Sequence, residues 1–591
     1  MTKGGEFLIK EQESKNIFIP EEFTEEQKMM ASATNEFVAK ELDPHRKRFE
    51  NKDYKLTEYC MKKAGELGLL GIGIPEDYGG MGMSFNTSVL ICDKISGANG
   101  SFSTAFGAHT GIGTLPILLY GDNNQKKIYL PKLATGEWMG CYCLTEPEAG
   151  SDANSGKTKA VLTKDGKYYI ITGQKMWISN AGFADIFIVF ARIENDKNIT
   201  GFILQKGMDG IILGEEEHKL GLNSSSTRQV FFNEVKVPKE NMLGGRGNGF
   251  KIAMNALNVG RIKLSAAVLD ACRRVTTNSI NYSNERKQFG VQISNFGAIK
   301  HKLAEMAVKT YAIESATYRA GNEIEKNIKR LESEGKNHQQ AHLKGVEEYA
   351  IECSIVKVLG SEIIQFCSDE GIQIFGGMGY SADTPMEAAY RDARIARIYE
   401  GTNEINRMLI VGMILKKVMK GELDIITPAL KITSELMSIP SFESIDEKKL
   451  FSLEKEHLKK LKKVILMTAG KAAQHYAMEI EKEQEILINL ASMIIDIYAT
   501  ESAILRTEKL ATLNSEQDTK YQIYMSKLFL YSAIKNCQKY AEEVILSFTT
   551  GDEQKILLTG LKRFTKGYTI NPKKLRINIA DKLIKENRFC F

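Results

Sequence analysis

The sequence predicts a mainly α-helical protein that carries one β domain inserted between helical domains. Only 11 prolines among 591 residues favour long helices. Between 141 and 245 the helical patterns give way to short runs rich in β-branched and aromatic residues, after which helical patterns resume. The chain therefore divides into four predicted domains: an N-terminal helical domain at 1–140, a middle β domain at 141–245, a helical domain at 246–420 and a further helical domain at 441–591.

The middle domain has the clearest strand and turn signals. The run KDGKYYIITGQKMWISN contains the pair Asp165-Gly166, which predicts a hairpin turn in front of a strand. Further strands are predicted at DIFIVFARI, ITGFILQ and TRQVFFNEVKVP. The run GGRGNG (244–249) lacks the Lys-Ser/Thr pair of a phosphate-binding loop. We interpret it as the linker that leaves the β domain.

Two stretches outside the β domain carry further expectations. In QEILINLASMIIDIYATESAIL (484–505), apolar residues recur at helical spacing and predict an amphipathic helix whose apolar face lies in a core. The polar run EKNIKRLESEGKNHQQAHLKG (325–345) predicts an extended connection between two helices, with helix resuming at about Val346. The sequence suggests no role for residues 331–345.

Composition and charge exclude several classes of protein. The formal net charge of +5 is too small to predict nucleic-acid binding, and the segment 561–591 holds 9 basic and 2 acidic residues. This basic end is either a solvated tail or a segment that binds an anionic membrane surface peripherally. The nine cysteines form no CxxC pair, so neither a zinc site nor a disulfide framework is predicted, and we expect no metal. Without a signal core or a run of roughly 20 apolar residues, the expected location is the cytoplasm.

Five short runs occur along the chain in a fixed order: CYCLTEPEAGSDANS (141–155), KMWISN (175–180), NERKQFG (284–290), QIFGGMGY (373–380) and RIYEGTNEI (397–405). Together they resemble the acyl-CoA dehydrogenase flavoproteins, over roughly residues 25–420. The resemblance implies an N-terminal helical domain, a β-barrel-like middle domain and a C-terminal four-helix bundle. The additional C-terminal helical domain, with GGMGY and IYEGTNEI, resembles the very-long-chain subgroup and its bacterial relatives.

The resemblance implies an oxidoreductase that converts a long-chain fatty acyl-CoA to the trans-2-enoyl-CoA in fatty acid β-oxidation. FAD takes the hydride, and electron-transferring flavoprotein reoxidises it. Such a reaction needs a base for the α-proton and hydrogen-bond donors on the thioester carbonyl. The extra domain resembles what replaces a second dimer in tetrameric relatives, so we expect a homodimer.

Glu400 is the candidate catalytic base. Alone, a carboxylate beside a glycine at a helix break is usually a solvated residue, but the resemblance assigns Glu400 to proton abstraction. Its backbone N–H and a ribityl hydroxyl of FAD would hold the thioester carbonyl, and Gly401 would leave room for the thioester. Burial against an apolar acyl chain should raise the pKa of Glu400. Some relatives carry the base at the position of Gly260, and here that rival carboxylate is absent.

The other predicted site residues follow from the resemblance. Ser151, Asn258, Arg261 and Gly401 are expected to bind the acyl-CoA substrate. The expected FAD-binding residues are Tyr142, Leu144, Thr145 and Ser151 beside the isoalloxazine; Trp177, Ile178 and Ser179 over its outer face; Arg286 and Gln288 from a neighbouring subunit; Phe296; Gln373, Gly376 and Gly377 across the dimer; and Thr402 and Glu404 beside the base.

Three of these residues have ordinary structural interpretations when each is considered alone. Trp177 would be a core aromatic residue. Arg286 would be a solvated charge near a helix end. Thr402 would be a helix N-cap.

Two other functions remain open at this stage. An acyl-CoA oxidase has a related fold, an added C-terminal domain and the same base, but it passes electrons to oxygen. A non-enzymatic assembly factor on the same scaffold is the second alternative, although the intact Glu400 and flavin motifs favour an enzyme. The chain-length preference depends on the depth of the acyl pocket, which the sequence does not fix.

Overall fold

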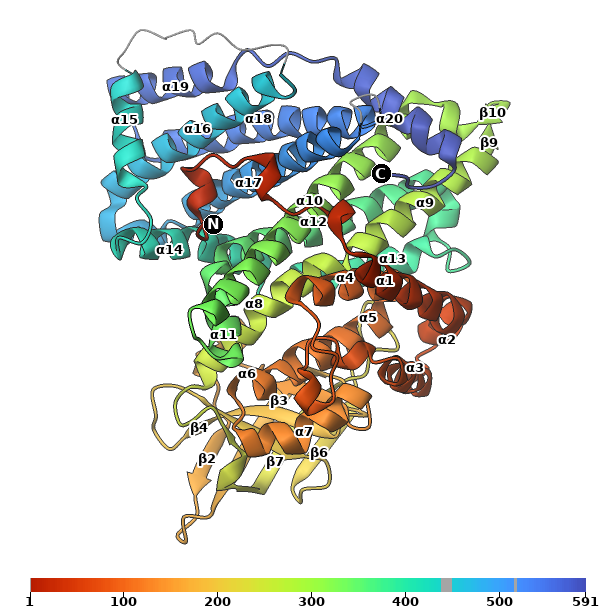
Figure 1. The fold of residues 1–591 in the computed structure, drawn as a ribbon, viewed down its shortest axis with the longest axis vertical. Coiled ribbons are helices and arrows are strands. Elements are labelled where there is room, and N and C mark those ends of the chain that lie inside the picture. The colour runs from red at the N-terminus through yellow and green to blue at the C-terminus, as the bar shows by residue number, and fades with distance from the viewer. Residues whose placement is uncertain (1, 437–448, 515–517) are drawn as a thin grey trace.

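The structure is a computed structural model that describes residues 2–436, 449–514 and 518–591. It is mainly helical, with one eight-stranded sheet beneath the helices in the view of Figure 1. The predicted fold class is confirmed: helical domains flank an inserted β domain, and further helices follow at the C-terminal end. The predicted start of the fourth domain, residue 441, lies outside the described residues.

The first helices precede the sheet and pack on one side of it. Side-chain caps at Thr24, Ser84 and Asp122 start α1, α4 and α7. Residues of α6 and α7 share an apolar core with strands of the sheet. The helices are α1 (Glu25–Phe37), α2 (Arg46–Glu50), α3 (Tyr54–Glu66), α4 (Phe85–Ser96), α5 (Gly100–Gly107), α6 (Leu115–Tyr120) and α7 (Asn123–Thr135), and the helical turn Ala108–Gly113 continues α5.

The sheet has the order β6-β7-β3-β2-β4-β5-β8, and β1 pairs with β4 in parallel. The predicted hairpin turn joins β2 and β3, where Gly166 has a φ of +69°. The strands are β1 (Gly140–Cys143), β2 (Lys159–Leu162), β3 (Tyr168–Ser179), β4 (Ile186–Ile193), β5 (Thr200–Gln205), β6 (Ile211–Glu216), β7 (Thr227–Pro238) and β8 (Met242–Leu243). The run GGRGNG follows β8 and leads into the next helix, as its interpretation as a linker predicts.

The helical domain after the sheet holds the longest helices of the first 420 residues. Its elements are α8 (Gly249–Ala267), α9 (Leu269–Glu285), the hairpin β9 (Lys287–Gln288) and β10 (Val291–Gln292), α10 (Gly297–Ser333), α11 (His338–Glu348), α12 (Ala350–Phe375), α13 (Met386–Arg394) and α14 (Asn403–Met419).

The predicted extended connection at 325–345 is wrong. Residues 325–333 continue α10, and α11 begins at His338, eight residues before the predicted resumption at Val346. The side chain of Asn337 caps α11 by accepting a hydrogen bond from the Gln340 backbone N–H at 2.9 Å. The polar composition hid these helical turns because their solvent-facing sides carry few apolar residues.

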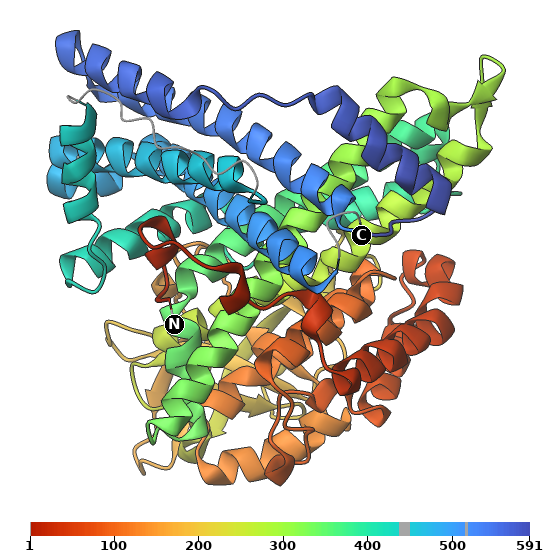
Figure 2. The same ribbon diagram turned by 45° about the horizontal axis from the view of Figure 1, so that its top comes forward.

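The C-terminal helices form a layer above α10, α12 and α14 (Figures 1 and 2). They are α15 (Ile426–Leu436), α16 (Ser452–Tyr476), α17 (Gln484–Leu513), α18 (Lys520–Phe548), α19 (Gly551–Thr565) and α20 (Pro572–Glu586). The amphipathic helix predicted at 484–505 is α17. By length and hydropathy α17 could span a membrane, but 89% of its most apolar window is buried inside the protein, as expected of a core helix.

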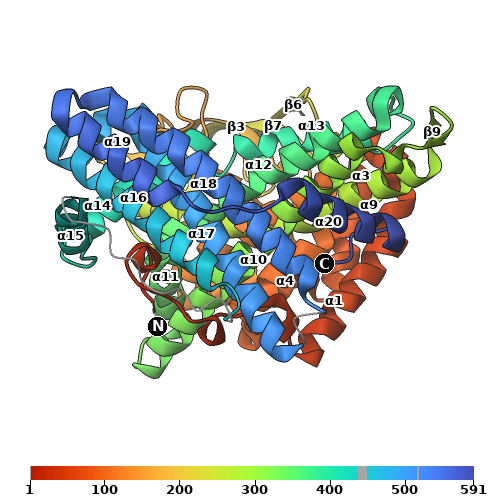
Figure 3. The ribbon, with the colours of Figure 1, turned by 90° about the horizontal axis from the view of Figure 1, so that it is seen from above.

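Both ends of the chain pack against the helical layer. The N-terminal segment before α1 is held by ion pairs from Arg506 to Glu21 at 2.6 Å and from Lys509 to Glu22 at 2.5 Å. The basic C-terminal segment 561–591 contains the end of α19 and all of α20, and α20 lies along α10 with Leu583 fully buried (Figure 3). This segment is therefore part of the packed fold, and its interpretation as a solvated tail is wrong.

Candidate active site

The break that contains Glu400 lies between the turn Ile395–Arg397 and α14. Glu400 has a φ of +59° and Gly401 a φ of +81°, so two successive residues adopt the left-handed conformation. This conformation is uncommon for a glutamate and costs about 1–3 kcal/mol, which the surrounding contacts must offset. Thr402 then caps α14 by accepting a hydrogen bond from the Ile405 N–H at 3.3 Å, so its interpretation as an N-cap is confirmed.

Three buried side chains hold the carbonyl groups of this break. The Asn406 amide donates hydrogen bonds to the carbonyl oxygens of residues 400, 401 and 402 at 2.8–3.3 Å. Arg261 Nε donates to the Glu400 carbonyl at 3.3 Å, and Lys357 Nζ donates to the Gly401 carbonyl at 2.6 Å. The break is thus fixed by groups from α8, α12 and α14, which explains how the left-handed turn persists.

Asn406 and Lys357 were missed by sequence reasoning. Asn406 looks like an ordinary polar residue in the first turns of a helix, and Lys357 is more than 40 positions from the break. A weak signal exists for Lys357, because a lysine within the apolar run ECSIVKVLGSEII requires a buried partner. Lys357 is fully buried, and burial lowers its pKa to about 7 against the raising effect of Glu400.

The Glu400 carboxylate lies in the space that a side chain at residue 260 would occupy. A Cβ built on Gly260 would stand 2.5 Å from Glu400 Oε2, so any larger residue would displace the carboxylate. Oε2 is buried and has no hydrogen-bond partner among the described residues. Burial raises the pKa of Glu400 to about 7, opposed by Arg261 and Lys357. This carboxylate has the unpaired, desolvated environment expected of a base that acts near neutral pH.

Part of the middle domain faces the same carboxylate. Tyr142 and Leu144, at the end of β1, are each 7% exposed. The Tyr142 hydroxyl is buried and finds no hydrogen-bond partner within the described ranges of the chain. Its pKa is raised by burial and, to a smaller extent, by the charge of Glu400. A buried donor without a partner marks a place where another group is expected to bind. Thr145 follows Leu144 and is half-buried, whereas Ser151 is exposed.

Trp177 lies at an irregularity in β3. The β3–β7 register shifts between Lys175 and Ile178, and Trp177 has a φ of +62°. The bulge turns the indole outward, leaving it 53% exposed, while Ile178 is buried. The interpretation of Trp177 as a core residue is therefore wrong. A large exposed aromatic side chain at a bulge fits a surface that another group covers.

A cavity of about 380 Å³ borders Glu400 and Gly260. Ser179 also lines it, which connects it to the Trp177 bulge. On α5 and its continuation, Gly107 and Gly111 line the same cavity, and a Cβ on either would meet nothing within 4 Å. Glycines spaced at i and i+4 thus leave one helix face open toward the cavity.

The predicted substrate contacts on α8 lie beside the break. Asn258 and Arg261 are buried, and Arg261 Nη1 donates to Asn258 Oδ1 at 2.8 Å. Gly401 lies within reach of the same side chains, since its built Cβ would stand 3.8 Å from Arg261 Nη2. Glu404 is in the first turn of α14, where backbone hydrogen bonds lower its pKa.

The remaining predicted cofactor residues do not border this cavity. Among the cavity-lining residues of this chain, none comes from the β9–β10 hairpin or from the turn after α12. Each of these two segments carries an exposed aromatic side chain: Phe289 of the hairpin is 93% exposed and Tyr380 of the turn is 88% exposed. The residues concerned are Arg286, Gln288, Gln373, Gly376 and Gly377, all exposed, and Phe296, which is half-buried and in edge contact with Phe289.

Sequence profiles of one family match most of the chain. The acyl-CoA dehydrogenase N-terminal domain matches residues 24–137, the middle domain 141–235, and profiles described as the acyl-CoA dehydrogenase C-terminal domain match 247–415 and 460–563. The last match covers most of α16, all of α17 and α18 and most of α19, so this part of the additional C-terminal region also matches a domain of this family.

Individual relatives agree with the profiles. A probable acyl-CoA dehydrogenase of Bacillus subtilis is 42% identical over 564 residues, which cover 95% of this chain and 94% of that protein. Human mitochondrial very long-chain specific acyl-CoA dehydrogenase is 40% identical over 58% of this chain and 51% of its own length. The crystal structure of an acyl-CoA dehydrogenase complexed with FAD from Bacillus anthracis has a TM-score of 0.96 and 41% identity, with complete coverage of both chains. The half-buried Glu400 carboxylate and the cavity beside it agree with these matches, which show that the chain belongs to the acyl-CoA dehydrogenase family of FAD-dependent oxidoreductases.

Proposed function

We propose that this protein oxidises a long-chain fatty acyl-CoA to the trans-2-enoyl-CoA, with Glu400 as the base that removes the α-proton. The observation that carries the proposal is the Glu400 carboxylate itself. It is desolvated, has a pKa near 7, and borders a cavity of about 380 Å³ lined partly by glycines. A carboxylate with only a structural role would be expected to have a hydrogen-bond or ion-pair partner.

The residues present fit FAD as the cofactor. The charge of Glu400 acts on Tyr142, whose hydroxyl has no partner among the described residues, and Ser179 lines the same cavity as Glu400. Trp177, with its exposed indole, is two residues before Ser179. A planar ring system bound here would satisfy the hydroxyl and cover the indole. We propose that Leu144, Thr145, Ser151 and Ile178 complete this region. When bound, FAD supplies a two-electron acceptor for the substrate's β-hydride. The protein groups must therefore handle the proton and the thioester carbonyl.

Glu400 serves both of these tasks in the proposal. As a carboxylate it accepts the α-proton, and its raised pKa makes it a stronger base than an exposed glutamate. Its backbone N–H has no acceptor among the described residues, so it is available to a thioester carbonyl, where negative charge develops. Lys357 and Arg261 donate hydrogen bonds to the Gly401 and Glu400 carbonyls and so fix the backbone that carries this N–H.

A long acyl chain is the substrate that the cavity favours. One face of α5 and its continuation carries small residues toward the cavity over a rise of about 12 Å: Ser103, Gly107 and Gly111. Larger residues at these positions would shorten the cavity. We propose that Asn258, Arg261 and Ser151 bind the CoA side of the substrate, outside the apolar part.

A homodimer would complete the cofactor site. The single chain exposes a set of residues that do not line its own cavity: Arg286, Gln288, Gln373, Gly376 and Gly377. The same two segments carry the exposed Phe289 and Tyr380. An arginine at such an interface suits a diphosphate because its guanidinium binds two oxygens at once. We propose that these residues bind the FAD of the second subunit, with Phe296, Thr402 and Glu404 adding contacts within the site.

We propose that the reduced FAD passes its electrons to electron-transferring flavoprotein rather than to oxygen. The test supplies palmitoyl-CoA to the purified protein, with an electron-transferring flavoprotein or a dye acceptor in one arm and oxygen alone in the other. Rapid acceptor reduction with little peroxide supports the dehydrogenase. Peroxide formed at the full rate of substrate turnover would instead identify an acyl-CoA oxidase. A protein that purifies without flavin and binds none would favour a non-enzymatic assembly role.

Peripheral membrane binding is a second proposal, carried by the basic excess in 561–591. Because α20 packs on α10, its deletion would disturb the fold, so charge reversal at the exposed Lys573 and Lys574 is the better test. Binding to anionic vesicles should fall in K573E/K574E and should be retained after reversal of the exposed Lys164 and Lys167 in the β domain. Equal binding by both variants would contradict a membrane role for α20.

A further inference from the structure

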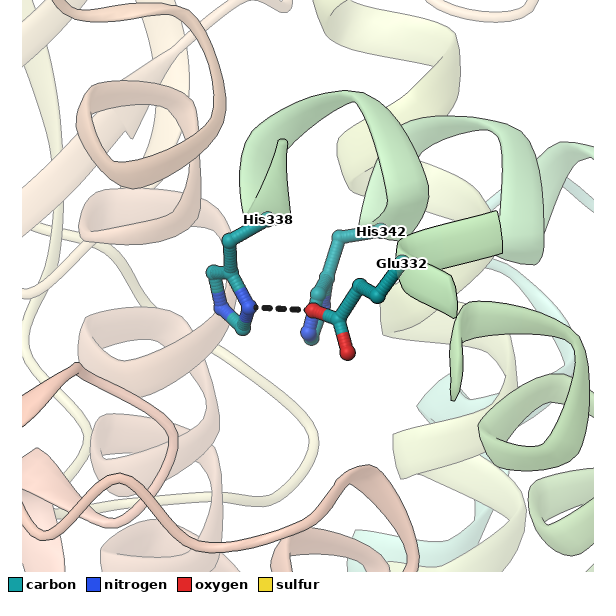
Figure 4. A group of neighbouring side chains, drawn as sticks. All are labelled: Glu332, His338 and His342. Atoms are coloured by element: carbon teal, nitrogen blue, oxygen red, sulfur yellow. Dashed lines mark hydrogen bonds and ion pairs between the residues drawn. The ribbon is translucent and has the colours of Figure 1, made fainter. Parts of the chain in front are cut away.

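The turn between α10 and α11 brings together three side chains that none of the preceding roles uses. Glu332 lies at the end of α10, and His338 and His342 lie on α11. One ligand atom from each lies within 4.8 Å of the others. Figure 4 shows the carboxylate and the two imidazole rings pointing toward one another across the turn.

Local backbone structure creates this arrangement. Gly335, with a φ of +86°, reverses the chain after α10, and the Asn337 cap starts α11. His338 and His342 are four residues apart on one helix, so both rings project from the same face. Their ring centroids are 4.2 Å apart, and Glu332 reaches this face from the preceding helix.

An ordinary ion pair accounts for the positions of Glu332 and His338, but not for that of His342. His338 Nδ1 and Glu332 Oε1 are 2.8 Å apart, which a single hydrogen bond satisfies. His342 is different, because neither of its ring nitrogens has a hydrogen-bond partner in the described parts of the chain. An imidazole nitrogen without a hydrogen-bond partner is available to bind a metal ion.

We propose that Glu332, His338 and His342 form a site for a divalent transition-metal ion such as Zn²⁺. Two imidazole nitrogens and one carboxylate oxygen are a donor set that suits Zn²⁺ and leaves a fourth position for water. Tetrahedral bonds of about 2.0–2.2 Å place ligand atoms roughly 3.3 Å apart. The donor atoms must therefore shift: His338 Nδ1 and Glu332 Oε1, now 2.8 Å apart, must separate slightly, and the wider gaps within the group must close. Glu332 and His338 can do so, because their side chains are 37% and 49% exposed. Mg²⁺ is not expected to bind, because it prefers an octahedral set of oxygen ligands.

The position of α11 gives the ion a structural consequence. Gln339 donates to the Leu119 carbonyl of α6 and accepts from Lys126 Nζ at 3.1 Å, so α11 is tied to the N-terminal helices. His342 and Val346 line a second cavity, together with apolar residues of α4, α5 and α6. A metal ion that joins α10 to α11 would therefore fix the wall of this cavity and stabilise the fold.

The test uses the untagged, full-length, flavin-containing protein, so that no affinity tag contributes histidines. Zn²⁺ is measured by equilibrium dialysis with elemental analysis, and the melting temperature is recorded with and without Zn²⁺. The variants are His338→Ala and Glu332→Gln, which alter exposed side chains and should fold normally. His301→Ala, which removes an exposed histidine elsewhere on α10, is the matched control.

The site predicts about one Zn²⁺ per chain in the wild type and in H301A, with a higher melting temperature when Zn²⁺ is present. In H338A and E332Q the affinity should fall at least about tenfold, and the zinc-dependent rise in melting temperature should disappear. Mg²⁺ should produce neither effect. Absence of saturable Zn²⁺ binding, or binding of equal strength in H338A and E332Q, would overturn the proposal.

Discussion

At the scale of single residues, Glu400 combines several unfavourable features in one place. It adopts a left-handed conformation, and burial raises its pKa to about 7. Its Oε2 is buried and has no hydrogen-bond partner in the part of the chain that the structure describes. Each feature costs folding free energy, and each is expected where a residue is held for chemistry rather than for stability. Asn406, Lys357 and Arg261 supply the compensating hydrogen bonds.

The raised pKa of Glu400 predicts a pH-dependent stability difference. The ordinary pKa is 4.5, so between pH 4.5 and 7 the folded state binds more protons at this site than the unfolded state. The contribution of Glu400 to stability therefore falls as the pH rises through this window. At pH 8, Glu400→Gln should increase the free energy of unfolding by at most about 3 kcal/mol and so raise the melting temperature. At pH 4.5 the substitution should have little effect.

Calorimetry of the wild type and E400Q at the two pH values measures this difference, and Glu422→Gln, an exposed carboxylate, is the control. In the wild type, kcat/KM should rise with pH and level off above about 7, because the free enzyme must carry the ionised base. An E400Q variant that is less stable than the wild type at pH 8 would contradict a desolvated, unpaired carboxylate.

At the scale of elements, sequence patterns predicted the helices, strands and turns that are determined by neighbouring residues in the chain. The hairpin at Gly166, the strands and the apolar face of α17 follow from periodicity and turn residues. Helix α11 could not be recognised, because most of its side chains are polar and its start depends on the cap at Asn337. The outward position of Trp177 depends on a bulge that only the pairing of β3 with β7 creates.

In the candidate site, too, features set by local sequence could be predicted and features set by long-range packing could not. Glu400 and the importance of Gly260 could be inferred from motifs, and the structure brings these two positions together. The contacts of Asn406 and Lys357 with the break could not be inferred, because they depend on how α12 and α14 pack. Long-range packing of this kind leaves no periodic signal in the sequence.

The open face of α5 predicts a change in chain-length preference. Gly107→Leu places a branched side chain in the space where a Cβ now meets nothing within 4 Å. Activity with palmitoyl-CoA should fall at least about tenfold relative to activity with butyryl-CoA, because lost cavity length affects only the longer chain. Rates with a dye acceptor across an acyl-CoA series measure this ratio.

Gly412→Leu is the matched control for this substitution, since Gly412 is a helical glycine of α14 whose Cβ would also meet nothing within 4 Å. An unchanged palmitoyl-to-butyryl ratio in G107L would show that the acyl chain does not follow this face of α5.

At the scale of the whole molecule, buried ionic groups join the C-terminal helices to the catalytic domain. Arg319 of α10 contacts Glu501 of α17 at 2.9 Å, and Lys462 of α16 contacts the same carboxylate at 2.5 Å. Such pairs fix the relative position of helices, because separating the partners leaves charges buried without compensation. The extra domain is thus an integral part of the fold, and it leaves the β9–β10 hairpin exposed on another surface.

The exposed hairpin predicts that dimerisation and flavin retention are linked. Phe289→Asp places a charge on an aromatic side chain that is 93% exposed in the single chain. If this surface packs against a second subunit, the variant should sediment as a monomer and lose most of its FAD, because Arg286 and Gln288 would no longer reach the partner's cofactor. Analytical ultracentrifugation and the flavin-to-protein absorbance ratio measure the two effects.

Met29→Asp, which changes another largely exposed apolar side chain on α1, is the control and should leave both properties unchanged. A monomeric wild type with full flavin content would contradict the shared cofactor site.

The assignment of Glu400 as the base is tested most directly by the first half-reaction. Wild type and E400Q, both loaded with FAD, are mixed with palmitoyl-CoA without oxygen, and the flavin absorbance is followed in a single turnover. The wild type should bleach rapidly, whereas E400Q should bind the substrate but bleach at least about 10²–10⁴-fold more slowly, because the amide cannot accept the α-proton. Bleaching of E400Q at a rate near that of the wild type would show that another group removes the proton.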